Sequence, residues 1–192
     1  APTALNGDTR TMNITVSPPP VPVISSSLMA SGTNGIAFSY QIQASNAPTG
    51  YTATGLPSGL SFSAATGLIS GTPTVGGSFN VTISASNQGG AGPSSTLAIS
   101  LSPTGQTITF PAHTTLTRPF SPSPSNTFAI SPTATASSSL PVSYVSKTGG
   151  ICSVAGTTVT MLAAGTCTIG ANQGGNASFT VATEVTRSVT IT

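Results

Sequence analysis

The stretch Thr9-Arg10-Thr11-Met12-Asn13-Ile14-Thr15-Val16 alternates apolar and polar side chains along most of its length. Met12, Ile14 and Val16 fall on one side, and Thr11, Asn13 and Thr15 fall on the other. A period of two residues is typical of a β-strand that buries one of its faces. The stretch therefore predicts a strand, and its three apolar side chains form the predicted contact face.

The same pattern recurs twice later in the chain. Residues 186–192 repeat it closely, and residues 95–102 are a looser copy. Each later copy closes a body of about 80–90 residues, a usual size for a small β-domain. The first copy closes nothing, and an orphan strand is unstable alone because its backbone groups need a neighbour. Either a preceding domain completes this strand or another molecule does.

The composition excludes several classes of function. The 192 residues include four Lys and Arg and two Asp and Glu, or 3% charged residues, against about 25% in an ordinary soluble domain. A net charge of +2 without a basic cluster argues against a nucleic-acid surface. No apolar run predicts membrane insertion, and the start at Ala1 is expected of a processed product. Runs of Thr, Val and Ile between Gly and Pro predict an all-β protein.

Three segments are predicted. Residues 1–19 hold the orphan strand and a linker whose prolines favour a stiff polyproline II spacer. Residues 20–102 and residues 103–192 are each predicted to form a β-sandwich, because short strands are separated by turn residues. Two alternating runs of the first sandwich are predicted to bury one face each: Ile36, Phe38, Tyr40 and Ile42, then Phe79, Val81, Ile83 and Ala85.

Between those runs lie Gly55-Leu56-Pro57-Ser58-Gly59-Leu60-Ser61-Phe62 and Thr66-Gly67-Leu68-Ile69-Ser70-Gly71-Thr72-Pro73. This wording resembles the Ig-like repeat family of long bacterial surface and secreted proteins, a relative of the dystroglycan-type cadherin-like domain. Its glycines are expected where turns need a positive φ, and its apolar residues are expected in the core. Cadherin relatives bind calcium through acidic residues. Because Asp8 and Glu184 are the only acidic residues here, we carry over no calcium site and expect no cofactor.

Residues 106–192 resemble a second Ig-like family of tandem bacterial repeats. The resemblance rests on Gln106-Thr107-Ile108-Thr109-Phe110, on Leu140-Pro141-Val142-Ser143-Tyr144, and on the run from Ile151 to Ile169. The two resemblances together imply two tandem Ig-like β-sandwich domains plus an extra N-terminal β-strand.

Cys152 and Cys167 are the only cysteines, and both lie in strand-like segments. We favour a disulfide, which would close a loop of about 15 residues, add roughly 3 kcal/mol and indicate an oxidising compartment. The alternative is two buried thiols. A metal site is not expected, because these cysteines and His113 do not reach four ligands. The spacing also lacks the C-x-x-C pattern of redox sites.

No residue set predicts catalysis, so the chain is not expected to be an enzyme. His113 lacks a carboxylate and nucleophile in a triad-like arrangement, and Asp8 and Glu184 are too far apart in sequence to predict a paired cleft. Lys147, with Glu184 and an asparagine, suggests an isopeptide bond of the kind found in some pilus domains. A solvated lysine before a turn is the simpler interpretation.

Asn13, Asn80 and Asn176 each begin an N-glycosylation triplet. In a chain this rich in Thr, such triplets also arise by chance. Both interpretations stay open, and surface glycans remain among the candidate partners.

These observations predict a structural subunit of a bacterial extracellular or cell-surface filament. Residues 9–16 would add as a strand to a neighbouring copy, with alternate apolar side chains filling pockets. Residues 186–192 already supply the second domain with a last strand, so the acceptor edge must lie elsewhere. The first alternative is a spacer or stalk segment beside other Ig-like domains of a long adhesin or secreted enzyme. The second is a carbohydrate-binding accessory module.

Overall fold

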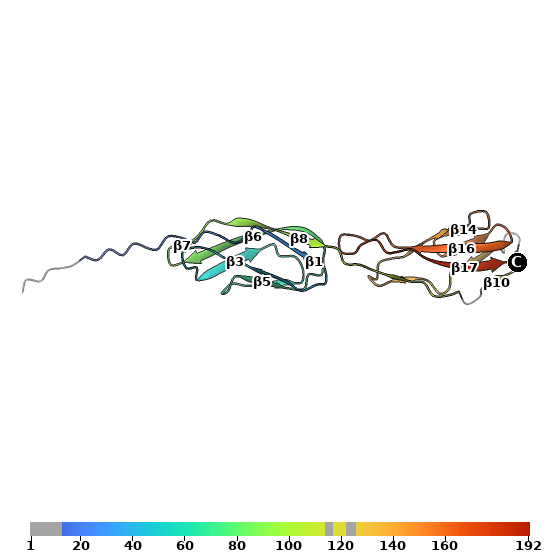
Figure 1. The fold of residues 1–192 in the computed structure, drawn as a ribbon, viewed down its shortest axis with the longest axis horizontal. Coiled ribbons are helices and arrows are strands. Elements are labelled where there is room, and N and C mark those ends of the chain that lie inside the picture. Colours follow the sequence, from blue (N-terminus) through green and yellow to red (C-terminus); the bar gives the residue numbers. More distant parts are fainter. Residues whose placement is uncertain (1–12, 114–116, 122–125) are drawn as a thin grey trace, which may run out of the picture.

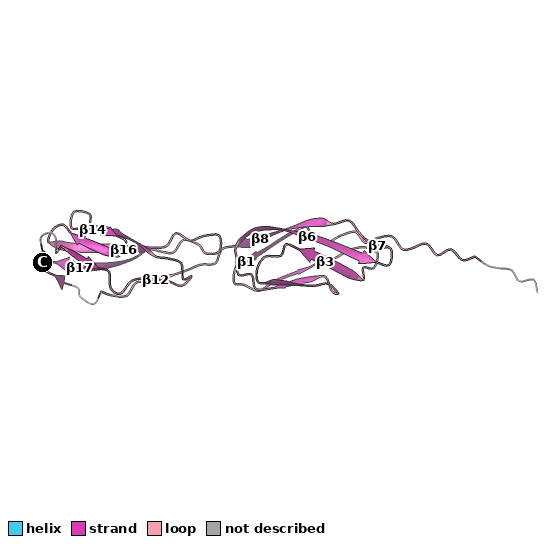
Figure 2. Cartoon of the chain, turned by 180° about the vertical axis from the view of Figure 1, so that it is seen from behind, coloured by secondary structure: helices cyan, strands magenta, loops and turns pink. Residues whose placement is uncertain are grey.

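The fold was analysed in a computed structural model of the chain, which describes residues 13–113, 117–121 and 126–192. Two β-sandwiches lie end to end and form an elongated molecule (Figure 1). Every regular element of the described residues is a strand, as Figure 2 shows from behind. The predicted all-β fold class is therefore confirmed.

The first sandwich consists of two sheets. One has the strand order β1-β8-β6-β3, with β7 beside β6, and the other has the order β2-β5-β4. β1 runs parallel to β8 across five paired residues, whereas β6 pairs antiparallel with both β8 and β3. The bounds are β1 (Met29–Thr33), β2 (Phe38–Gln41), β3 (Gly50–Thr54), β4 (Leu60–Ser63), β5 (Leu68–Gly71), β6 (Gly77–Asn87), β7 (Gly90–Ala91) and β8 (Ser95–Ser102).

Strand β8 shows how alternation builds this core. Leu97, Ile99 and Leu101 are buried, while Ala98 and Ser100 between them are exposed. These leucines and isoleucine pack with buried residues of β2, β5 and β6 in one hydrophobic cluster. The looser copy of the opening pattern is therefore a strand with one buried face, as predicted.

Two glycines of the Ig-like wording have the positive φ that the resemblance implied. Gly59 has a φ of 88° and Gly71 a φ of 139°. A Cβ at Gly59 would lie 2.1 Å from the carbonyl oxygen of Thr72, and one at Gly71 would lie 2.3 Å from the carbonyl oxygen of Gly59. The two segments approach so closely that side chains are excluded from both positions.

The second sandwich repeats the strand order of the first. Its sheets run β10-β17-β16-β13 and β11-β15-β14, with a small added pair of β12 and β9. β10 again runs parallel to the last strand, β17, and its described residues pair with Thr190 and Ile191. The bounds are β9 (Ile108–Thr109), β10 (Thr117–Arg118), β11 (Thr127–Ala129), β12 (Thr135–Ala136), β13 (Ser143–Ser146), β14 (Cys152–Ala155), β15 (Thr158–Met161), β16 (Gly165–Asn172) and β17 (Val185–Ile191).

The structure corrects one detail of the predicted strands. Ile36 was expected on a buried face, but it is 58% exposed. Its N–H donates to the carbonyl of Thr33 and closes a turn, so the strand begins only at Phe38. At the N-terminus, residues 13–16 belong to no strand, and residues 9–12 of the predicted strand, Met12 included, lie outside the described residues.

Candidate functional site

The two sandwiches meet at a joint built around Ser178. This residue lies in the loop between β16 and β17, and its carbonyl accepts hydrogen bonds from the backbone N–H of Thr104 at 2.9 Å and from Nδ2 of Asn34 at 3.0 Å. The hydroxyl of Ser178 also accepts the N–H of Gly76 at 2.9 Å. One serine of the second sandwich thus contacts two loops of the first sandwich and the connecting segment.

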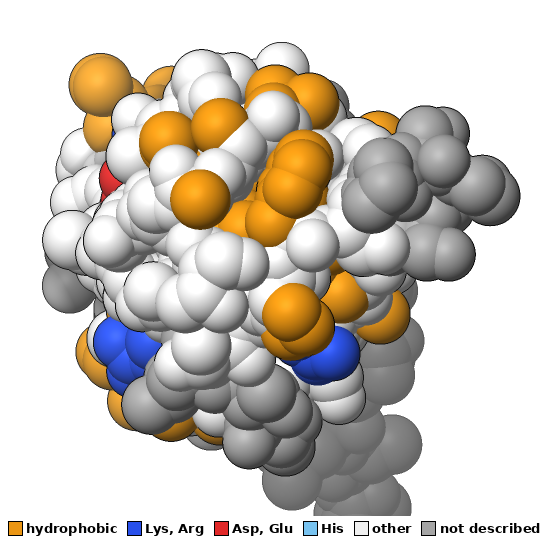
Figure 3. All heavy atoms as spheres, turned by 90° about the vertical axis from the view of Figure 1, so that its right-hand side faces the viewer, with side chains coloured by type: hydrophobic (Ala, Val, Ile, Leu, Met, Phe, Trp, Pro, Cys, Tyr) orange, Lys and Arg blue, Asp and Glu red, His pale blue; other side chains and the backbone are white. Residues whose placement is uncertain are grey.

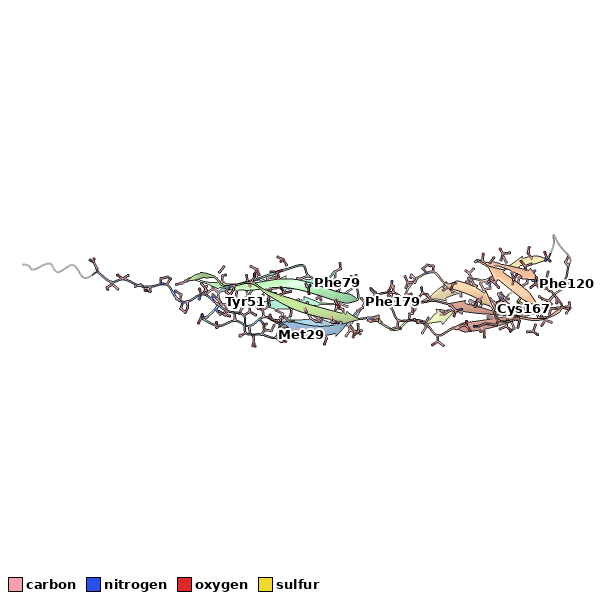
Figure 4. All side chains as sticks on the ribbon, turned by 90° about the horizontal axis from the view of Figure 1, so that it is seen from above. Met29, Tyr51, Phe79, Phe120, Cys167 and Phe179 are labelled. Carbon is pink, nitrogen blue, oxygen red and sulfur yellow. A yellow bond between two sulfur atoms is a disulfide. The ribbon has the colours of Figure 1, made fainter. Side chains whose placement is uncertain are left out.

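The connecting segment is itself part of the joint. Thr104 forms a parallel β-bridge with Phe179, which Figure 4 shows between the two sandwiches. The N–H of Thr180 donates to the carbonyl of Thr104 at 2.9 Å, and the hydroxyl of Thr104 donates to the carbonyl of Asn34. The link between the domains is therefore held on both sides by hydrogen bonds.

Gly76 allows the two sandwiches to approach each other closely at this joint. Its Cβ, if present, would lie 2.1 Å from the carbonyl oxygen of Ala177, a distance that no real contact shows. Asn34 is only 5% exposed, so the polar contact beside Gly76 is sheltered from water. Buried hydrogen bonds of this kind contribute more than exposed ones, because losing them leaves polar groups unsatisfied.

Two glutamines support the loop that carries Ser178. Nε2 of Gln106 donates to Oε1 of Gln173 at 2.8 Å and to the carbonyl of Thr180 at 2.6 Å. Gln106 is 9% exposed, and the hydroxyl of Ser138 donates to its Oε1. The loop is thus fixed to the start of its own domain before it reaches the other one.

Residues 13–16, the described part of the predicted contact strand, lie at the opposite end of the first sandwich from the joint (Figure 1). Ile14 is 75% exposed and Val16 is 84% exposed, and no described residue pairs with their backbone as a strand partner. Met12, the third predicted contact residue, lies outside the described residues. The apolar face of this segment is therefore open to a partner at two of its three predicted positions.

The cysteines form a disulfide inside the second sandwich. Cys152 of β14 and Cys167 of β16 are bonded, with their Cα atoms 5.6 Å apart, and both are fully buried. Because β14 and β16 belong to different sheets, the bond ties the two layers together through the core. A buried disulfide is typical of proteins of oxidising compartments.

The remaining titratable residues form no active-site arrangement in the described chain. His113 lies in a loop but is buried, with its ring edge-on to Phe110 at 5.5 Å between centroids. Lys147 forms an ion pair with Glu184, 2.9 Å between Nζ and Oε2, with 45% of the lysine side chain exposed. The Lys147 hydrogen bond, and after it one from Asn172, lowers the pKa of Glu184 below its ordinary value of 4.5.

That ion pair disfavours the isopeptide interpretation. Lys147 is 45% exposed and pairs with a carboxylate, as the simpler interpretation of a solvated lysine expects. Asp8 lies outside the described residues. Within the described ranges, no three His, Cys, Asp or Glu side chains gather as a metal site, and no helix could span a membrane.

The three glycosylation triplets have different surroundings. Asn13, Asn80 and Asn176 are all exposed. Oδ1 of Asn176 accepts the N–H groups of Ser178 and Phe179, at 2.8 and 3.0 Å, and so shapes the joint loop. Asn176 thus has a structural role that its triplet did not indicate.

The residues of the joint were not identified from the sequence. Asn34, Gly76, Gln106 and Ser178 look like ordinary loop residues. One signal was available: the loops after β6 and β16 both contain Asn-Gln-Gly-Gly, at residues 87–90 and 172–175. A repeat of loop residues, rather than of core residues, indicates a repeated contact.

Comparisons with known proteins agree with the fold. Residues 20–102 match the family model described as "Putative Ig domain". Solved structures that match parts of the chain include a "putative alpha-galactosidase" from Bacteroides fragilis, 30% identical with a TM-score of 0.40, over 44% of this chain and 20% of that one. The protocadherin GammaB4 extracellular domain is 14% identical with a TM-score of 0.42 and covers 89% of this chain and 34% of its own.

Domains 3–5 of the extracellular part of Drosophila OTK are 12% identical with a TM-score of 0.44, over 85% of this chain and 58% of that one. The chain thus spans less than two thirds of each of these structures. The comparison with curated proteins gives no match. Residues 20–102 match an Ig-domain family, and the architecture of the chain is an all-β, Ig-like sandwich fold.

Proposed function

We propose that the chain is a non-catalytic structural unit of a bacterial extracellular filament, in which copies join head to tail through residues 9–16. The observation that carries this proposal is the joint at Ser178. A polar contact that excludes even a methyl group at Gly76 keeps two sandwiches in line, which a spacer or filament needs and a flexible tether does not.

The N-terminal segment supplies the proposed head. Ile14 and Val16 are exposed at alternate positions of an extended segment that leads away from the first sandwich. Strand addition uses this pattern, because backbone groups pair with a sheet edge while alternate side chains enter pockets. A contact between two different surfaces of one chain does not close on itself, and so it continues into a filament.

The last strand of the second sandwich supplies the proposed acceptor. β1 pairs with five residues of β8, whereas the described residues of β10 pair with Thr190 and Ile191 of β17. Among the described residues, the outer edge of β17 from Val185 to Val189 therefore has no strand partner. In this proposal the incoming strand would lie beside the existing last strand rather than replace it.

Direction also favours this edge. A strand added parallel to β17 would leave the acceptor at its C-terminal end, so the donor's first sandwich would continue the long axis. Figure 3 shows hydrophobic side chains gathered at that end, and Phe120, which Figure 4 places there, is 44% exposed. The proposed partner is thus a second copy of this chain.

A stalk segment is the second candidate. The similarity of residues 9–15 to residues 186–192, which include most of β17, favours it, because a preceding domain of the same kind would end in such a strand. The carbohydrate-binding alternative gains less. Of the three Tyr and seven Phe residues, all of them described, only Phe120 is strongly exposed.

Electron microscopy and light scattering of the full chain and of a chain without residues 1–17 test the proposal. We expect filaments only from the full chain. A matched pair of variants tests the contact face: Ile14→Asp with Val16→Asp should abolish filaments, whereas Asn13→Asp with Thr15→Asp, on the opposite side, should retain them. Monomers from every version would support the stalk instead. Filaments from the truncated chain would overturn strand addition.

A further inference from the structure

At its end away from the joint, the first sandwich contains a second site that binds a connecting segment, here called the linker site. β6 ends at Asn87 and is followed by Gln88-Gly89-Gly90, and β16 ends at Asn172 and is followed by the same three residue types. In the second sandwich this loop holds the segment that enters the domain, through Gln173 and Gln106. The equivalent loop of the first sandwich holds the proline-rich linker.

Two asparagines hold that linker. Nδ2 of Asn87 donates to the carbonyl of Pro20 at 2.9 Å, and Nδ2 of Asn46 donates to the carbonyl of Val21 at 2.8 Å. Asn87 also donates to the carbonyl of Asn46 at 2.7 Å, which joins the two asparagines into one unit. Because prolines lack an N–H, the linker offers mainly carbonyl acceptors, and amide side chains are suitable donors for them.

Two glycines bring the linker against the loop. A Cβ at Gly89 would lie 1.9 Å from the carbonyl oxygen of Pro19, and one at Gly92 would lie 1.8 Å from that of Pro22. Only glycine permits such an approach at both places. The linker is therefore in direct contact with the domain along residues 19–22.

The backbone beside the linker site is strained. Asn46 has a φ of 58° and Ala47 a φ of 47°, which is a left-handed conformation that alanine rarely adopts. Strain of this kind persists where the surrounding structure requires it, and here it places Asn46 against Val21.

The sequence before the linker site matches the sequence before the joint at Ser178. Ile14-Thr15-Val16-Ser17-Pro18 has the same pattern as Ile99-Ser100-Leu101-Ser102-Pro103, which is the end of β8 and the start of the connecting segment. In both cases an alternating run ends in Ser-Pro and reaches the loop after β6 or β16 within a few residues.

We propose that residues 17–22, with Asn46, Asn87, Gly89 and Gly92, form a second rigid joint that holds the sandwich completed by residues 9–16 in line with the first sandwich. The identity of that sandwich, the second domain of a neighbouring copy, rests on the proposed function. The rigidity of the linker does not, because it is a property of the single chain.

Nitrogen-15 relaxation of the full chain tests rigidity directly at Ser17 and Val21. We expect order parameters near those of β6, about 0.85, and a fall below about 0.6 in the variant Asn46→Ala/Asn87→Ala and in Gly89→Ala. Gly149→Ala is the control, because nothing lies within 4 Å of its Cβ. Amide signals of β6 and β8 report whether each variant is folded.

Low order parameters at Ser17 and Val21 in the unaltered chain would overturn the proposal, as would order that survives in both variants. Filament shape gives a separate readout. The variants Asn46→Ala/Asn87→Ala and Gly89→Ala should still assemble, because residues 9–16 are intact. Their filaments should bend more than those of the control. A chain that never assembles would contradict the proposed function and leave the relaxation result to decide on the joint.

Discussion

Replacing Gly76 by alanine should uncouple the two sandwiches without unfolding either one. The new Cβ would lie 2.1 Å from the carbonyl oxygen of Ala177, and ordinary contact begins at 3.4 Å. The loop of the second sandwich must therefore withdraw by about 1.3 Å, because neither atom belongs to a flexible side chain. The backbone of Gly76 itself has no positive φ, so alanine is tolerated locally.

This displacement breaks the hydrogen bonds that cross the joint. The N–H of Gly76 and Nδ2 of Asn34 donate to Ser178 at 2.9 and 3.0 Å, and a withdrawal of that size takes both beyond bonding distance. At a net value of roughly 0.5–1.5 kcal/mol each, their loss weakens the joint by about 1–3 kcal/mol. The equilibrium between closed and open joints then shifts by about 5- to 150-fold.

Residual dipolar couplings measured separately for the two sandwiches report the coupling. In the unaltered chain both sandwiches should share one alignment tensor, and in Gly76→Ala the two tensors should differ in magnitude. Gly105→Ala is the matched control in the connecting segment, because nothing lies within 4 Å of its Cβ. A shared tensor in Gly76→Ala would refute the argument that this close contact fixes the joint.

Three further predictions concern stability. Replacing Cys152 and Cys167 together by alanine should destabilise the second sandwich by roughly 3 kcal/mol in denaturant titrations and leave the first sandwich unchanged. Gly59→Ala should destabilise the first sandwich by at least about 1–3 kcal/mol in the same titration, because it forces alanine to a φ of 88° and also places its Cβ 2.1 Å from the carbonyl oxygen of Thr72. The pKa of Glu184 is lowered in the fold, so its pairing with Lys147 stabilises the fold above the ordinary pKa of 4.5. This stabilisation is lost as the pH falls through the lower pKa of the folded state. Thermal unfolding of Glu184→Gln between pH 5 and pH 2 should therefore depend less on pH than that of the unaltered chain.

Alternation predicted the strands of the sandwich cores well, because one buried face imposes a period of two on the sequence. β8 and β17 lie within one residue of the repeats that indicated them. Ile36 failed because alternation continued through a turn that Gly35, with a φ of 75°, makes possible. The alternation of side chains does not indicate where the backbone leaves the sheet.

The joint was harder to predict than the core for a physical reason. Its residues are chosen for backbone approach and hydrogen bonding, and neither property has a sequence period. Ser178 and Gly76 are 102 residues apart, and nothing local in the sequence links them. The repeated Asn-Gln-Gly-Gly residues and the two alternating runs that end in Ser-Pro are the sequence traces of the two linker contacts.

The parallel pairing of first and last strands determines how the molecule responds to tension. Pulling the two ends apart drags β1 against β8, and β10 against β17, along their length, so the hydrogen bonds of each pair must fail together rather than in succession. Among the described residues, two pair between β10 and β17 and five between β1 and β8, and on that count the second sandwich should yield first. Its disulfide then keeps the chain between Cys152 and Cys167, a sequence separation of 15 or about 50 Å when extended, out of the released length. The strand pair that is expected to separate first thus belongs to the domain whose disulfide limits its extension.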